Sequence, residues 1–266
     1  MKVDAAAVTD IGLVRDHNED AFLSEPPLFV VADGMGGHLG GEVASAIAIE
    51  TLREGFGKRG PEGVANSVHQ ANEAILRRSQ ADAAVEGMGT TITAAVLTGS
   101  NLHIVHVGDS RAYLRREGEL LLVTSDHTLV GEMVREGTLS DDQARVHPRR
   151  SILVRALGID TDVEIDLIDL PLQEGDRLLL CSDGLNSMIT DQMISELCAP
   201  EYTPEEACTR LVEAANQAGG TDNITVIVAD FAEGSEEASE LTEATDAPAE
   251  GEEGRGFMDR LLRRKT

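Results

Sequence analysis

The chain has 266 residues, 41% of them hydrophobic, and a formal net charge of −26 at pH 7. This length and apolar content fit one main domain with a sizeable core, and the acidic balance argues against nucleic-acid binding, which needs lysine and arginine to neutralise phosphates. No apolar run approaches the roughly 18 residues of a membrane-spanning helix, and the start of the chain lacks the basic and apolar regions of a signal peptide. Three cysteines without metal or redox spacing indicate a reducing, cytoplasmic environment.

Mixed β and α patterns follow one another along the chain, with no internal repeat. Strands are predicted, in order, at Lys2–Val8, Ala21–Ser24, Leu28–Ala32, Thr90–Leu97, Leu102–Val107, Arg111–Arg115, Leu120–Val123, Val163–Leu170, Arg177–Cys181 and Ile224–Asp230. Helices are predicted at Gly41–Phe56, Pro61–Ala83, Asp191–Leu197 (with Thr190 as N-cap) and Thr203–Ala218. Adjacent helices after adjacent strands indicate two sheets in layers rather than βαβ units.

Five short acidic clusters each close or follow a β-like run. They are Asn18–Asp20, Asp33–His38, Gly108–Ser110, Ser182–Gly184 and Asp222–Asn223. Hard divalent cations take oxygen ligands, and glycine beside a carboxylate lets a backbone carbonyl approach as a further ligand. The clusters therefore predict a polynuclear metal site assembled from distant segments.

Eight motifs occur in a fixed order over residues 3–231. They are Arg15–Asp20, Asp33–His38, Gly89–Thr91, Val107–Arg111, Ser125–His127, Arg155–Gly158, Ser182–Leu185 and Asp222–Thr225. A single Gly-Asp pair carries no weight, whereas eight ordered motifs are specific. The series resembles the bacterial form of the metal-dependent protein phosphatase 2C family. The resemblance implies an α+β fold, a four-layer αββα sandwich whose two central antiparallel sheets are flanked by helix pairs.

The resemblance also implies an activity and a cofactor. The chain would hydrolyse phosphoserine and phosphothreonine monoesters in proteins by direct attack of a metal-bridging water or hydroxide, using two Mn²⁺ or Mg²⁺ ions and, in bacterial members, a third. The implied metal ligands are Glu19, Asp20, Asp33, the Gly34 carbonyl, Asp109, Asp183 and Asp222. Among them Asp33 bridges two ions, Asp109 shares the third with Asp183, and Asp20 acts through metal-bound water.

Arg15 matches the phosphate-binding arginine of the family, and a planar guanidinium can donate two parallel hydrogen bonds to a phosphoryl group. Eukaryotic members place a histidine, a proposed general acid, where this chain has Met35. The proton for the leaving alkoxide would then come either from His38 or from metal-bound water. The sequence contains no Cys-x5-Arg nucleophile loop, and Cys181 lies in an apolar run that predicts burial.

Residues 128–150 resemble the mobile flap of the family. Its basic residues, Arg135, His147, Arg149 and Arg150, either dock a phosphopeptide or only balance an acidic surface. Asp126 lies in a family motif, and we expect it to have a structural role rather than a metal-binding one.

Three domains or segments are expected: a catalytic domain over 1–232, a disordered acidic linker over 233–254 and a basic amphipathic tail over 255–266. The tail would dock on an anionic membrane surface or in a partner's acidic groove, or else fold back onto the acidic domain. We expect a cytoplasmic monomer, peripheral at the inner membrane if the tail binds lipid, that opposes a cognate serine/threonine kinase. A non-enzymatic phosphoprotein-binding module and a scaffold that acts through residues 233–266 are the competing hypotheses.

Overall fold

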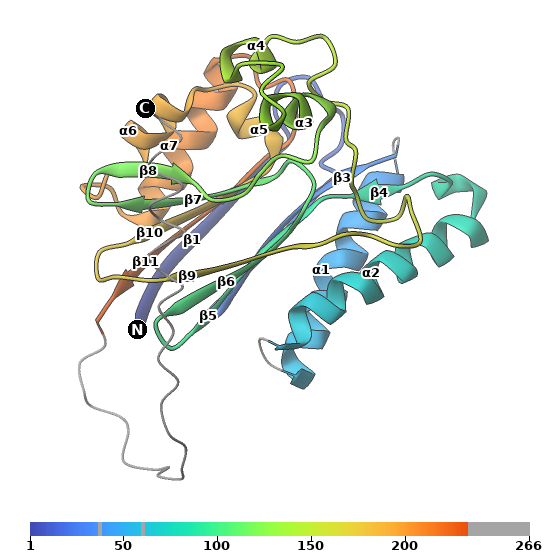
Figure 1. Cartoon of the computed structure of the whole chain (residues 1–266), viewed down its shortest axis with the longest axis horizontal. Coiled ribbons are helices and arrows are strands. Elements are labelled where there is room, and N and C mark those ends of the chain that lie inside the picture. The colour runs from blue at the N-terminus through green and yellow to red at the C-terminus, as the bar shows by residue number, and fades with distance from the viewer. Residues whose placement is uncertain (37–38, 60–61, 234–266) are drawn as a thin grey trace.

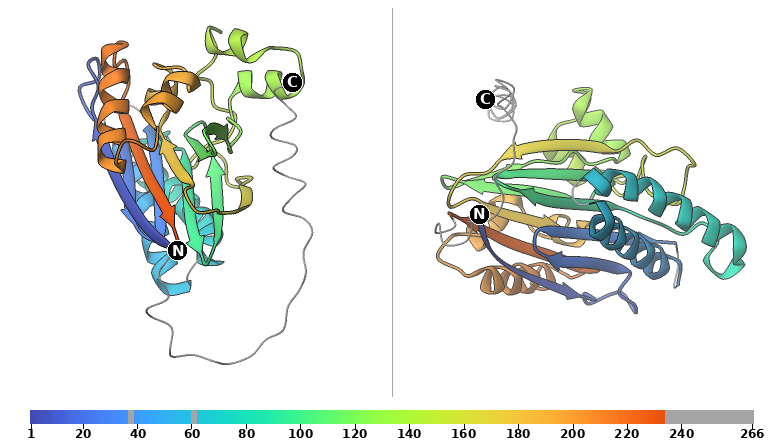
Figure 2. Two further views of the ribbon diagram at one scale, coloured as in Figure 1. Left: turned by 90° about the vertical axis from the view of Figure 1, so that its left-hand side faces the viewer. Right: turned by 90° about the horizontal axis from the view of Figure 1, so that it is seen from below.

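The computed structural model describes residues 1–36, 39–59 and 62–233. Two antiparallel sheets lie face to face at its centre (Figures 1 and 2). The first has the order β1 (Lys2–Asp10), β11 (Ile224–Ala232), β10 (Arg177–Cys181), β7 (Arg111–Arg116) and β8 (Glu119–Leu122). The second has the order β2 (Asp20–Glu25), β3 (Leu28–Met35), β5 (Ile92–Thr98), β6 (Asn101–Val107) and β9 (Asp166–Pro171), with β4 (Gly89–Thr90) paired to β3.

Each sheet carries helices on its outer face. On the β2–β9 sheet lie α1 (Gly40–Arg59) and α2 (Glu62–Ala81), followed by the short η1 (Ala83–Val85). On the β1–β8 sheet lie α6 (Asp191–Leu197) and α7 (Pro204–Gln217). The predicted four-layer αββα sandwich is confirmed.

Three hydrophobic cores hold the four layers together, and β10 shows how the sequence produces them. Leu178 and Leu180 point into the core between the sheets, whereas Leu179 and Cys181 point into the core under α6 and α7. Side chains alternate along a strand, so a continuous apolar run is the pattern of a strand buried on both faces. A third core joins the other sheet to α1 and α2.

Local sequence signals set the starts of α6 and α7. The Oγ1 atom of Thr190 accepts the backbone N–H of Met193, so the predicted N-cap of α6 is confirmed. Thr203 and Glu206 form a capping box at the start of α7, where Pro204 occupies the first turn. Cys181 is fully buried, as predicted.

The structure differs from the expected elements in several places. The strand expected at Thr90–Leu97 is divided between β4, Gly89–Thr90, and β5, Ile92–Thr98. The predicted strand Val163–Leu170 starts later, as β9, and carries alternating exposed residues because it is the edge of its sheet. The segment that resembles a flap contains two short helices, α3 (Leu129–Arg135) and α4 (Asp141–Arg145), and a four-residue helix, α5 (Asp183–Asn186), follows β10. These helices are too short to show a 3.6-residue period.

The acidic linker and basic tail, predicted to start at 233 and 255, lie outside the described residues from 234 onward. Within the described ranges, no helix combines the length and apolarity needed to cross a bilayer.

Candidate active site

Sheet register brings the first two predicted carboxylates together. Asp20 starts β2 and is the direct partner of Asp33 near the end of β3. A Cβ atom on Gly34 would collide with the backbone oxygens of Glu19 and Gly41, so only glycine fits there. The Glu19 carboxylate lies against Gly41, with its Oε2 atom 2.5 Å from where a Cβ of Gly41 would stand. Glu19, Asp20, Asp33 and the Gly34 backbone thus occupy one corner of the β2–β9 sheet.

The other sheet contributes the facing carboxylates. Asp183 begins α5 directly after β10, and Asp222 precedes β11. The hydroxyl of Ser182 donates to Asp20 Oδ2 at 2.7 Å across the two sheets. Asp183 is within hydrogen-bond reach of Asp33, which joins the two halves of the site.

Asp109 follows β6 and is buried, with 8% of its surface exposed. The neighbouring Ser110 hydroxyl lies 2.7 Å from Thr91 Oγ1, which accepts the backbone N–H of Asp33 at 3.0 Å. The Asp109 segment is therefore linked to the Asp33 segment through Thr91.

The electrostatics confirm that these carboxylates face one another. Burial first, and then the charges of the neighbouring carboxylates, raise the pKa of Asp20 to about 7 and that of Asp183 to about 6. The same two causes raise the pKa values of Asp33 and Asp109 well above the ordinary range of an aspartate. Four acidic groups that repel one another, Asp109 buried and the other three half-buried, form an environment that a cation would stabilise.

The donor set fits hard divalent cations. It consists of carboxylate oxygens plus the Gly34 carbonyl, and Asp20 Oδ1 is buried without a hydrogen-bond partner. No three His, Cys, Asp or Glu side chains in the described part of the chain are arranged so that they could hold one ion together. Two of the candidate ligands already have side-chain partners, since Arg15 Nη2 donates to Asp222 Oδ2 at 2.7 Å and the Ser182 hydroxyl donates to Asp20 Oδ2 at 2.7 Å. Binding of ions would exchange these contacts.

Arg15 lies in the loop between β1 and β2, and its side chain is 48% exposed. Its positive charge is surrounded by Asp222, Glu19 and Asp33, which together outweigh partial burial and raise its pKa. The sequence placed Arg15 beside the metal carboxylates, and the structure brings it there. His38, the expected proton donor, lies outside the described residues.

The chain is similar to known proteins of one family. The family model described as protein phosphatase 2C matches residues 14–223. The chain belongs to the protein phosphatase 2C family. It is 44% identical over 230 residues to the serine/threonine protein phosphatase PstP of Mycobacterium tuberculosis, covering 85% of this chain and 44% of that relative. It is 39% identical over 233 residues to the serine/threonine phosphatase stp of Listeria monocytogenes, covering 83% of this chain and 92% of that relative.

Solved structures of family members have the same fold as this chain. A crystal structure of the M. tuberculosis phosphatase PstP/Ppp superposes with a TM-score of 0.82 at 41% identity, covering 87% of this chain and 99% of that one. A crystal structure of the PstP catalytic domain in complex with two manganese ions has a TM-score of 0.80 at 39% identity, covering 87% and 99%. The chain therefore spans one family domain but less than half the length of the PstP relatives it matches.

Asn223, in the Asp222–Thr225 motif, holds the loop between β1 and β2 through its side chain. Its Oδ1 accepts the backbone N–H of Glu19 at 2.8 Å, and its Nδ2 donates to the carbonyls of Ile11 at 3.0 Å and His17 at 2.9 Å. One buried amide thus fixes the loop that carries Arg15. Its position directly after Asp222 was the available signal, because an amide beside a ligand commonly orients the ligand's surroundings.

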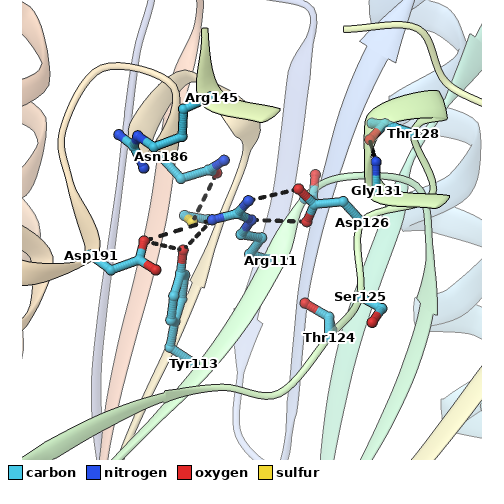
Figure 3. A network of polar contacts seen from close by, with 12 residues as sticks. Arg111, Tyr113, Thr124, Ser125, Asp126, Thr128, Gly131, Arg145, Asn186 and Asp191 are labelled. Carbon is cyan, nitrogen blue, oxygen red and sulfur yellow. Dashed lines mark hydrogen bonds and ion pairs between the residues drawn. The ribbon is translucent and has the colours of Figure 1, made fainter. Parts of the chain in front are cut away.

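A polar network around Arg111 lies beside residues 128–150, the segment that resembles a flap (Figure 3). Arg111 donates two parallel hydrogen bonds to Asp126, at 2.8 and 2.7 Å, and a third to the hydroxyl of Tyr113 at 2.9 Å. From the flap, Arg135 donates to the Asp126 carbonyl at 3.0 Å. The carboxylate of Asp126 is paired with Arg111 in this structure, which supports the structural role expected for it; that role stays a prediction.

Proposed function

We propose that the chain hydrolyses phosphoserine and phosphothreonine monoesters in proteins, using two Mn²⁺ or Mg²⁺ ions and a third, more weakly held ion. One observation carries the proposal: four aspartates from four distant segments, Asp109 buried and the other three half-buried, converge beside a half-exposed arginine and repel one another. That arrangement suits a phosphate monoester, whose negative charge repels carboxylates unless cations lie between them. Membership of a family with relatives named serine/threonine phosphatases supports the substrate class.

The acidic residues would hold the metal ions. Asp33 would bridge two ions, with Glu19 and the Gly34 carbonyl on one ion and Asp183 and Asp222 on the other. Asp109 would share the third ion with Asp183, and Asp20 would act through water. When bound, the ions supply Lewis acidity and lower the pKa of water so that it becomes the nucleophile at neutral pH.

Arg15 would bind the phosphoryl group. Its Nη2 is bonded to Asp222, and half of the side chain remains exposed, so the guanidinium has a free edge for phosphate oxygens. Were Asp222 to hold a metal ion instead, Arg15 Nη2 would also be available to the substrate. The choice between His38 and water as proton donor stays a prediction.

The test is hydrolysis of a phosphothreonine peptide by the full chain, with manganese and with chelator, in wild type, Asp33→Asn and Asp183→Asn. Manganese-dependent turnover that either substitution reduces at least about 10³-fold is expected, because each removes a ligand of the reacting centre. Asp169→Asn, an exposed carboxylate on the edge strand β9, is the matched control and should keep wild-type turnover. No turnover in the folded wild type, with metal bound, would favour the phosphoprotein-binding module instead.

The biological setting is part of the proposal. A phosphatase of this kind acts on phosphorylated proteins and opposes a serine/threonine kinase, and we place this one in the cytoplasm as a monomer. Residues 255–266 would dock it on a membrane surface or a partner. Deletion of residues 234–266 that preserves peptide hydrolysis but changes distribution between membrane and soluble fractions would support this; loss of hydrolysis would contradict it.

A further inference from the structure

A cavity lies at the far end of the β1–β8 sheet from the candidate active site. β10 runs from Arg177 toward Asp183, and β11 runs away from Asp222 to Ala232, so the cavity-lining ends of both strands lie about 20 Å or more along the strands from the carboxylates. In Figure 1 the end of β11 lies near the N-terminus, at the opposite end of the molecule from α3 and α4. The cavity has a volume of about 260 Å³ and is lined by Arg115, Glu174, Gly175, Asp176, Arg177, Cys198, Pro200, Asp230, Phe231 and Ala232.

Two arginines stand side by side on the wall of this cavity. Arg115 of β7 is the register partner of Arg177 of β10. Direct partners on antiparallel strands point to the same face with Cβ atoms about 5 Å apart, and like charges in that position destabilise the sheet. An anion is needed to offset the repulsion between them.

Arg177 has its anion and all of its hydrogen bonds. It donates to both oxygens of Asp230, at 2.6 and 2.7 Å. It also donates to the carbonyls of Cys198, Ala199 and Tyr202, at 3.2, 3.0 and 2.7 Å, at and just after the end of α6. Asp230 and the end of α6 are therefore already committed to Arg177.

Arg115 has neither. Its Nε atom is buried without a hydrogen-bond partner, and its guanidinium makes no ion pair with any described residue. Asp176 is held by Arg116 through two hydrogen bonds, at 2.8 and 2.6 Å. Burial raises the pKa of the Cys198 thiol to about 12, so the thiol is neutral at pH 7. Glu174, exposed at the rim, forms no ion pair within the described ranges.

We propose that this cavity binds a small oxyanion, a carboxylate, sulfate or phosphate group, held by the guanidinium of Arg115. The planar fork of an arginine matches two oxygens of such a group, and a guanidinium is more weakly hydrated than an ammonium, which suits a partly buried site. The volume accommodates one such ion with ordered water. The bound charge would offset the repulsion between Arg115 and Arg177. The site is independent of the proposed phosphatase activity.

The direct test observes the Nε–Hε groups of arginine by ¹H–¹⁵N NMR in the full, magnesium-loaded chain. Sodium sulfate is titrated against sodium chloride at constant ionic strength. The Arg115 resonance is assigned by its loss in Arg115→Gln, or in Arg115→Lys if the first variant does not fold. We expect this resonance to shift saturably in the low millimolar range. Arg78, an exposed arginine paired with Asp82 on α2, is the reference that should show no saturable shift.

Thermal unfolding tests whether sulfate stabilises the folded chain through Arg115. Sulfate should raise the unfolding midpoint of wild type more than that of Arg115→Gln, because a ligand that binds only the folded state stabilises it. Glu174→Gln should bind sulfate at least as tightly as wild type. If the Arg115 resonance moves only as Arg78 does, or if sulfate acts on Glu174→Gln but not on wild type, the cavity holds no external anion and the proposal is wrong.

Discussion

Replacing Asn223 with alanine tests whether one buried amide sets the geometry of the site. The substitution removes three hydrogen bonds, to the backbone of Glu19, Ile11 and His17. Asn223 is 4% exposed. Each bond contributes about 1 kcal/mol net, and partners left unsatisfied add to the loss, so we expect a decrease of about 3 kcal/mol in the free energy of unfolding.

The substitution should also impair activity. The loop between β1 and β2 carries both Arg15 and Glu19, so loosening it should raise the manganese concentration for half-maximal activity and lower kcat by at least about tenfold. Urea unfolding measures the first effect, and phosphopeptide hydrolysis across manganese concentrations, at a temperature where the variant is folded, measures the second.

Asn72→Ala is the matched control. Asn72 is 1% exposed and also makes three bonds, accepting from Gly158 N–H at 2.7 Å and donating to the carbonyls of Asp160 and Thr161 at 2.9 and 3.4 Å. It should lose similar stability and keep the manganese dependence of wild type. The reasoning fails if both variants change that dependence equally, or if Asn223→Ala changes neither quantity.

Three further predictions follow from other contacts. Arg111→Met should lower the free energy of unfolding by about 3 kcal/mol, because it leaves Asp126, whose side chain is 20% exposed, without its bidentate partner; a double-mutant cycle with Asp126→Asn that shows no coupling would contradict this. Gly34→Ala should abolish manganese-dependent turnover, since its Cβ meets the backbone of Glu19 and Gly41, and full activity would show that this backbone can yield. Burial lowers the pKa of His106 to about 4, below its value in the unfolded chain. Its contribution to the free energy of unfolding is therefore fully present above about pH 6.5 and falls by about 2 kcal/mol between pH 7.5 and pH 5. His106→Asn should flatten that part of the stability curve measured by urea unfolding, and an unchanged slope would count against this.

Much of the fold follows from alternation in the sequence. The two-sided burial of β10 and the capped helix α6 both have local causes, and both were predicted to within a residue or two. The late start of β9 and the short helix α5 have no such local cause, because an edge strand and a four-residue helix depend on what packs beside them. Tertiary context decided those elements.

The site could be predicted in composition but not in contacts. Carboxylates beside glycine at strand ends indicated which residues meet, and the register of Asp20 with Asp33 brings two of them together. The pairing of Arg15 with Asp222 and the bridge from Ser182 to Asp20 span more than 150 residues. No local pattern encodes such contacts, because they exist only once both sheets are stacked.

The pairing of β1 with β11 has a consequence for synthesis. Nine residue pairs join Lys2–Asp10 to Ile224–Ala232, so β1, which is synthesised early, cannot pair until β11 has been synthesised. Asp222 reaches its place in the same event. Chains emerge from the ribosome at about 5–20 residues per second, and contacts this distant in sequence form slowly. A nascent chain therefore holds most of the acidic groups of the candidate site for about ten seconds or more before β11 closes the sheet and brings Asp222 to them.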